Sequence, residues 1–91
     1  MSSYGRVKTL TVMIEAEELN ISEVTRRAGL SHTSTSRHLE YLVKSGLLTE
    51  KRFNRIRIFR INRGSPMVAA LERFVFDWKA ASESSFQRVY G

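Results

Sequence analysis

The sequence predicts a mostly α-helical domain of the α+β class, in which a small β-hairpin follows a pair of short helices. Apolar residues recur at helical spacing in several segments, glycines punctuate the middle of the chain, and one short stretch alternates as a strand does. At 91 residues the chain has the length of one domain, so residues 1–91 are assigned to a single unit.

Residues 5–18 are predicted to form the first helix, with apolar side chains on more than one side. Leu10 belongs to one face, and Val12 and Met13 carry the apolar surface onto others. A helix of this kind is usually buried on several sides. The following residues, 19–21, fit either a short strand or a connector.

Residues 22–45 contain the signals of two short helices joined by a tight turn. Ser22 is a candidate N-cap of the first helix, and Gly29 is expected to end it in the left-handed conformation that glycine adopts easily. Ser31 supplies a second N-cap, and Gly46 follows the second helix. Two short helices joined in this way form a helix-turn-helix.

A β-hairpin is predicted at about residues 47–62. Asn54 lies at its turn, because asparagine tolerates the positive φ that a tight turn needs. In the second strand Arg57, Phe59 and Ile61 fall on the same side. We expect the Phe and Ile side chains to enter the core, with the arginine-bearing tip beyond it.

The positive charge of the chain is concentrated in this hairpin. The net charge is +6, from 15 Lys and Arg and 9 Asp and Glu residues. Residues 46–63 hold +5 of it, because their six cationic residues face only Glu50. These six residues are Lys51, Arg52, Arg55, Arg57, Arg60 and Arg63. Such a concentration indicates a polyanionic partner.

A C-terminal helix is predicted at about residues 66–86, with Ser65 as N-cap and Pro66 at its first position. Its apolar stripe consists of Met67, Val68, Leu71, Phe74, Val75, Trp78 and Phe86. A second apolar patch at Phe76, together with the first helix, favours a shared interface in a homodimer. The residues expected there are Leu10, Val12, Met13, Leu71, Phe74, Val75 and Trp78.

Composition and spacing disfavour several classes of function. The chain has no Cys, which excludes disulfides, thiolate zinc sites and cysteine nucleophiles. No stretch approaches the ~18 apolar residues of a membrane span, and no secretory signal is evident, so a cytoplasmic protein without a membrane partner is expected. His32 and His38 lack the spacing of metal ligands on a helix, and no G-x-S-x-G motif accompanies the serines. We therefore expect no metal, no cofactor and no enzymatic activity.

A set of short motifs in the middle of the chain carries a family resemblance. An apolar-Ser-Glu start at 21–23 precedes Ala-Gly-Leu-Ser at 28–31, and Ser-Arg-His-Leu at 36–39 precedes Ser-Gly-Leu-Leu at 45–48. With these motifs the chain closely resembles winged helix-turn-helix transcriptional regulators, particularly the ArsR-like and MarR-like groups. The resemblance covers residues 21–62, in which the hairpin corresponds to the wing.

The resemblance implies a sequence-specific regulator, a repressor or an activator and usually a homodimer, that binds double-stranded DNA. Repression is the expected activity. The second helix would enter the major groove, which is about 12 Å wide and admits one helix. The positions facing bases are His32, Thr33, Ser34, Ser36 and Arg37. Backbone or wing contacts are expected from Ser31, Tyr41, Lys44, Lys51, Arg52, Asn54, Arg55 and Arg57. Two such helices one DNA turn apart, ~34–36 Å, imply a palindromic operator.

The chain departs from the family pattern in two ways. Thr35 stands where relatives commonly have a β-branched apolar residue, so the inner face of its helix is slightly more polar. The metal-sensing branch of the ArsR-like group uses Cys, or clustered His and carboxylates, and this chain has no Cys. Metal sensing is therefore not expected.

Two other functions remain open at this stage. Winged helices also serve as protein-interaction modules of larger assemblies, and the same fold binds RNA. The charge on the hairpin favours a nucleic acid over a protein partner. Binding to either DNA or RNA requires that residues 33–37 are exposed and flanked by the hairpin.

Overall fold

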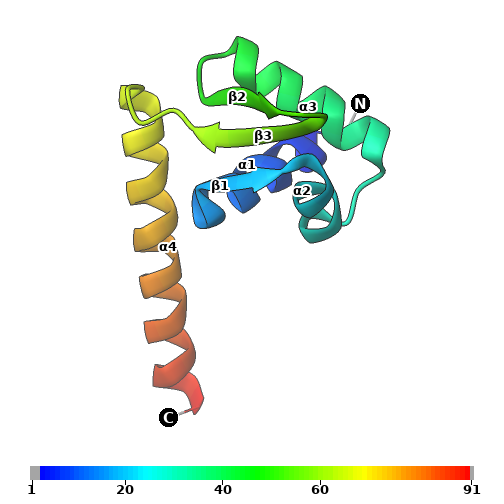
Figure 1. The fold of residues 1–91 in the computed structure, drawn as a ribbon. Helices are drawn as coiled ribbons and strands as arrows, with labels where there is room; N and C mark the ends of the chain where they lie inside the picture. Colours follow the sequence, from blue (N-terminus) through cyan, green and yellow to red (C-terminus); the bar gives the residue numbers. More distant parts are fainter. Residues whose placement is uncertain (1–2, 91) are drawn as a thin grey trace.

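Three helices pack on one side of a small antiparallel sheet, and a fourth extends away from it, in this computed structural model, which describes residues 3–90 and the side chains of residues 4–83 (Figure 1). In chain order the elements are α1 (Ser3–Ala16), β1 (Glu18–Asn20), α2 (Ile21–Ala28), α3 (His32–Lys44), β2 (Leu48–Phe53), β3 (Ile56–Ile61) and α4 (Pro66–Tyr90). The predicted class and the order of the helices and the hairpin are confirmed.

The sheet has the order β1-β3-β2, so β3 is its central strand. Phe59 on β3 lies opposite Leu19 of β1 on one side and Glu50 of β2 on the other. The short segment after the first helix is thus a strand rather than a connector, and it extends the predicted hairpin to three strands. Its pairing also explains why Ile58 is half-buried on the outer side of β3, because Ile58 lies opposite Asn20.

The core lies between the sheet and the first three helices. Phe59 and Ile61 enter it from β3, as predicted, and both are buried. They are joined in one cluster by Met13 of α1, Leu39 of α3 and Leu48 of β2. The base of the hairpin is therefore fixed by apolar burial on the side that faces α1 and α3.

The first helix of the helix-turn-helix is capped by a different residue from the one predicted. Asn20 is the N-cap of α2: its side-chain oxygen accepts from the Glu23 amide at 2.9 Å, and Glu23 accepts from the Asn20 amide at 3.0 Å. The assignment of Ser22 was wrong, because this reciprocal capping box begins two residues earlier. Gly29, at φ 66, and Ser31, which accepts from the Ser34 amide, confirm the other two predicted caps.

The outer helices differ from prediction at their ends. α1 stops at Ala16, because Glu17 adopts φ 74 and the backbone turns into β1. α4 begins at Pro66, as predicted, but continues to Tyr90. Phe86, placed on the apolar stripe of α4, lies outside the residues whose side chains are described.

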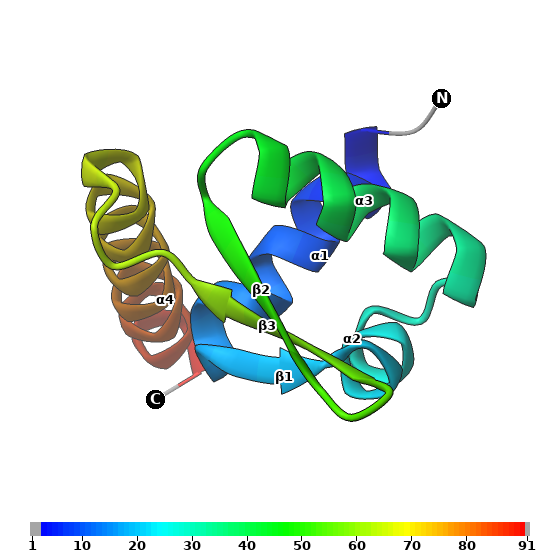
Figure 2. The same ribbon diagram turned by 45° about the horizontal axis from the view of Figure 1, so that its top comes forward.

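α4 runs away from the rest of the molecule (Figures 1 and 2). Val68 is buried, and Leu71 and Val75 pack partly against the core. From 76 to 83 every side chain is exposed. An ion pair between Lys79 and Glu15 ties the exposed part to α1.

Asn20→Ala should destabilise the domain by about 1 kcal/mol, the usual cost of losing a side-chain N-cap. The matched control is Ser22→Ala, an exposed substitution two residues away that should be near neutral. Urea denaturation followed by circular dichroism measures both. A loss at Ser22 that equals the loss at Asn20 would contradict the assignment of the cap.

Candidate nucleic-acid interface

Helix α3 turns one face into the core and the other to solvent. Thr35, Leu39 and Leu42 are buried. The Thr35 hydroxyl donates to the Ser31 carbonyl at 2.9 Å, so the more polar inner position leaves no unpaired hydroxyl. The exposed residues on α3 are His32, Thr33, Arg37, Glu40, Tyr41 and Lys44, and Ser34 and Ser36 are half-buried.

The outer part of the hairpin is exposed throughout. Residues 51–56 are all accessible, and they include the expected contacts Lys51, Arg52, Asn54 and Arg55. Asn54 adopts φ 59, the turn conformation predicted for it. In both ribbon views the tip of the hairpin lies close to α2 (Figures 1 and 2).

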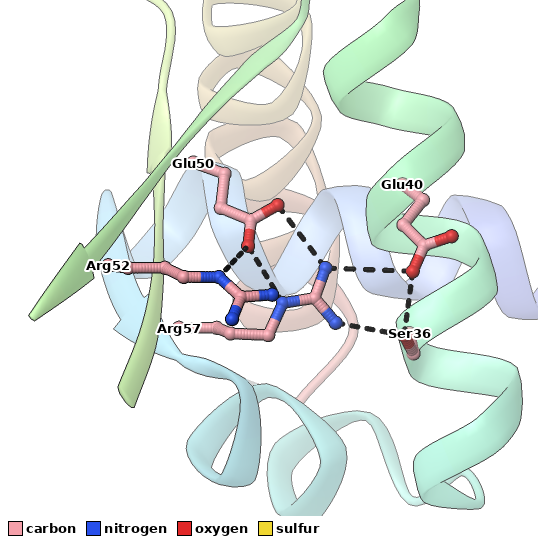
Figure 3. Close-up of polar contacts among 5 residues, drawn as sticks. All are labelled: Ser36, Glu40, Glu50, Arg52 and Arg57. Carbon is pink, nitrogen blue, oxygen red and sulfur yellow. Dashed lines mark hydrogen bonds and ion pairs between the residues drawn. The ribbon is translucent and has the colours of Figure 1, made fainter. Parts of the chain in front are cut away.

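Arg57 joins the hairpin to α3 through a polar network (Figure 3). Its Nε donates to Glu50 Oε2 at 2.7 Å, and its Nη2 donates to Glu50 Oε1 at 3.2 Å. Its Nη1 donates to Ser36 Oγ on α3 at 3.1 Å. Ser36 donates to Glu40 Oε2 at 3.1 Å, and the same carboxylate oxygen lies 3.6 Å from Arg57 Nη2.

Within this network each charged group stabilises the charged form of its partner. The hydrogen bond from Arg57, helped by the charges of Arg57 and Arg52, lowers the pKa of Glu50 against the opposing effect of burial. The hydrogen bond to Glu50 raises the pKa of Arg57, as do the carboxylates of Glu50 and Glu40. Both partners are therefore charged throughout the neutral range, and the bidentate geometry is the strong form of this pair.

Sequence reasoning assigned Ser36 to the bases and Arg57 to the wing contacts, whereas the structure engages both in this internal network. Only 20% of the Arg57 side chain is exposed, and its guanidinium lies 5.2 Å from the centre of the Phe59 ring. The sequence analysis assigns no contact to Glu40 or Glu50. For Glu50 the pairing of the hairpin is a usable signal, because residue 50 lies opposite Phe59 and therefore on the inward side.

A further cation on this surface comes from α1. The Arg6 guanidinium lies 3.7 Å from the centre of the Tyr41 ring, a close cation–π contact. Tyr41 is exposed on α3, so the N-terminal half of α1 adds positive charge beside the expected DNA-facing helix. Nothing in the local sequence around Arg6 indicates this contact.

Comparison with known proteins decides the family. The model of the MarR family matches residues 7–54, more than half of the 91-residue chain. The chain belongs to the MarR family. This match decides between the two groups that the sequence resembles, and the family is one of transcriptional regulators rather than enzymes.

Solved structures show the same winged-helix fold. The chain is 17% identical to the AntR antimony-specific transcriptional repressor, with a TM-score of 0.69 over 85% of this chain and 68% of that one. It is 23% identical to HlyU from Vibrio cholerae N16961, with a TM-score of 0.69 over 81% and 77% of the two chains. A MarR family transcriptional regulator from Silicibacter pomeroyi is 22% identical, with a TM-score of 0.65, and the match covers 86% of this chain but 54% of that one. A comparison with curated proteins gave no significant match.

The surfaces expected to pair two copies of this MarR-family chain differ in exposure. Phe74 and Trp78 are 62% and 64% exposed, and their rings stack 6.1 Å apart. The residues that pack partly against the core of their own chain are Leu10, Val12, Leu71 and Val75. Met13 is fully buried within the same core, so it has no surface to offer a partner.

Metal-binding clusters and membrane-spanning helices are absent from the described part of the chain. There, no three His, Cys, Asp or Glu residues lie close enough together to hold a metal ion. None of the helices described is long and apolar enough to cross a membrane.

His38 holds α3 against α1. It is buried, and a side chain on Gly5 would place Cβ 2.8 Å from its Nε2, so the two helices meet closely here. Burial lowers the pKa of His38 from its ordinary value of 6.5, and the charges of Arg6 and Arg37 lower it further. His38 is therefore part of the packing between α1 and α3.

The free energy of unfolding should therefore fall as the solution is acidified through pH 6.5. Below that pH the unfolded chain binds a proton at His38 that the folded chain does not, and the loss is complete below the lowered pKa of the folded state. Urea denaturation between pH 8 and about pH 5, a range that spans the ordinary histidine pKa, measures the loss. His38→Gln should remove this part of the pH dependence, and His32→Gln, at an exposed position on the same helix, should retain it. An unaltered pH profile in His38→Gln would contradict the assignment.

Proposed function

We propose that this chain is a dimeric, sequence-specific DNA-binding repressor. In the proposed complex α3 lies in the major groove and reads base edges with His32, Thr33, Ser34 and Arg37. The exposed hairpin cations and Ser31 contact the phosphate backbone or the minor groove. Tyr41 and Lys44, further along α3, are proposed as additional backbone contacts.

The observation that carries this proposal is the joint placement of two surfaces. Residues 33 and 37 are exposed on α3, and the cationic hairpin is held against the same helix by the 3.1 Å bond from Arg57 to Ser36. A single duplex could meet both surfaces at once. Arg37 is the candidate for guanine, because its planar fork matches O6 and N7 together.

Dimerisation is proposed through the exposed part of α4. Phe74 and Trp78 form an apolar patch beside Thr11 of α1, and Phe76 and Met67 are exposed on the same helix. Large exposed apolar patches mark interaction sites. A dimer with two α3 helices about one DNA turn apart, ~34–36 Å, would bind a palindromic operator.

The proposal of repression rests on the relative whose own description is that of a transcriptional repressor. Its antimony specificity is not carried over, because soft metals and metalloids are held by thiolates and this chain has no Cys. A cytoplasmic location is part of this proposal, because a repressor acts where the DNA is.

Selection of bound duplexes from a random pool tests the function. The wild-type protein should enrich a palindromic sequence, and it should prefer that duplex to RNA of matching sequence. Arg37→Ala should lose the preference at one base position per half-site, a loss of roughly 1–3 kcal/mol of discrimination. Arg55→Ala should weaken all sequences alike and reduce the salt slope by about 1.

Two results would contradict this assignment. No enriched duplex, with tight capture of a protein instead, would favour an interaction module. Equal losses on every sequence from both substitutions would mean that α3 does not read bases.

The double substitution Phe74→Ala with Trp78→Ala should convert the dimer to monomer. Buried aromatic anchors typically contribute roughly 2 kcal/mol or more to an interface. Sedimentation equilibrium without DNA measures the effect. The control is Phe53→Ala, because Phe53 is 63% exposed like the α4 aromatics but lies at the hairpin tip. A dimer that survives the double substitution would assign the interface elsewhere.

A further inference from the structure

Two carboxylates lie where a polyanion is proposed to bind. Glu40 is on the solvent side of α3, and Glu50 is on the inward side of the hairpin. Each would repel phosphate, and neutralising either should strengthen DNA binding if charge alone mattered. Their presence on this surface calls for a compensating role.

We propose that Glu50 and Glu40 are positioning residues, which hold Arg57 as a strut between the hairpin and α3 and so fix the hairpin for DNA binding. The inference rests on the proposed function. It reassigns Ser36 and Arg57 from DNA contacts to parts of this strut.

Each of the three guanidinium nitrogens of Arg57 already donates a hydrogen bond within the protein. Nε and Nη2 form the bidentate pair with Glu50, at 2.7 and 3.2 Å, and Nη1 donates to Ser36 at 3.1 Å. Phe59 lies against the guanidinium on a further side. A phosphate contact by Arg57 would compete with Glu50 and Ser36 for the same guanidinium, whereas Lys51 and Arg55 have no carboxylate partner among the described side chains.

The strut occupies the position where apolar anchoring of the hairpin ends. Ile61 and Phe59 fix the base of β3 by burial, and Arg57 is the next residue on the same side. Beyond it, residues 53–56 are exposed. The direction of the tip, and with it the placement of Arg55, therefore depends on the last inward contact, which is the one that Arg57 makes with α3.

Glu50→Gln gives opposite signs for the two explanations. If Glu50 only contributes negative charge, its removal should tighten binding and steepen the dependence on salt. If Glu50 positions the hairpin, binding should weaken about tenfold, equivalent to about 1.4 kcal/mol. The salt slope should then become shallower by about 0.9 for each phosphate contact that the hairpin loses. Fluorescence anisotropy with the selected duplex, across a series of salt concentrations, measures both quantities.

Arg57→Lys provides a second variant that keeps the charge. Lysine also binds phosphate, as a point charge, but it cannot form the bidentate pair. The strut predicts that Arg57→Lys loses about as much affinity as Glu50→Gln, roughly tenfold. Near wild-type binding by Arg57→Lys would overturn the proposal.

Glu18→Gln is the matched control, because the ion pair of Glu18 with Arg60 joins β1 to β3 rather than the sheet to α3. This variant should bind DNA as the wild type does, or slightly tighter. Hydrogen exchange without DNA supplies an independent measurement: amides of 51–57 should exchange faster in Glu50→Gln than in Glu18→Gln. Equal exchange in the two variants would overturn the strut.

The outcomes separate this inference from the proposed function. A wild-type protein that binds no duplex would refute the function, while the hydrogen-exchange comparison would still decide whether the strut orders the hairpin. A wild-type protein that binds, with Glu50→Gln binding equally or more tightly, would refute the strut and leave the function standing.

Discussion

The structure depends on one continuous row of inward-facing side chains on β3. Ile61 and Phe59 bury apolar surface against α1 and α3, and Arg57 continues the row at the edge of the core. A charged side chain at such an edge is stable only when it is paired and hydrogen-bonded, and Glu50 with Ser36 accepts a hydrogen bond from each guanidinium nitrogen. Apolar burial at one end of the row and a charged network at the other thus orient the same hairpin against the same helix.

This arrangement changes what the local charge of the hairpin means. Six cationic residues lie between residues 46 and 63, but carboxylates of the same chain form ion pairs with several of them. Arg57 is paired with Glu50, Arg60 with Glu18, and Arg63 with Glu72. Exposed pairs are weak and open readily to a phosphate, whereas the half-buried, bidentate pair of Arg57 does not. Concentrated charge therefore indicates a polyanionic partner without identifying which cations touch it.

Local signals in the sequence predict the helix-turn-helix well, but the sequence carries no comparable signal for contacts between distant residues. Caps such as Ser31 act within one helical turn, so residue type and position suffice to find them. Even there Ser22 competes with Asn20, because both are capping residues and only the fold selects between them. The bond from Arg57 to Ser36 joins positions 21 residues apart, and no local pattern encodes it. The sequence does not predict the direction of α4 either. Its apolar stripe is longer than the part of the helix that packs on the core, so Phe74 and Trp78 are left exposed.

α1 links the two surfaces on which the proposed function depends. Its N-terminal half touches α3, where Gly5 meets His38 and Arg6 stacks on Tyr41. Its C-terminal end is tied to the exposed part of α4 by an ion pair. In a dimer formed through α4, a rigid helix rather than a loop would then set the position of each α3. The spacing of two recognition helices would follow from packing within the protomer, because close-packed interiors transmit displacement instead of absorbing it.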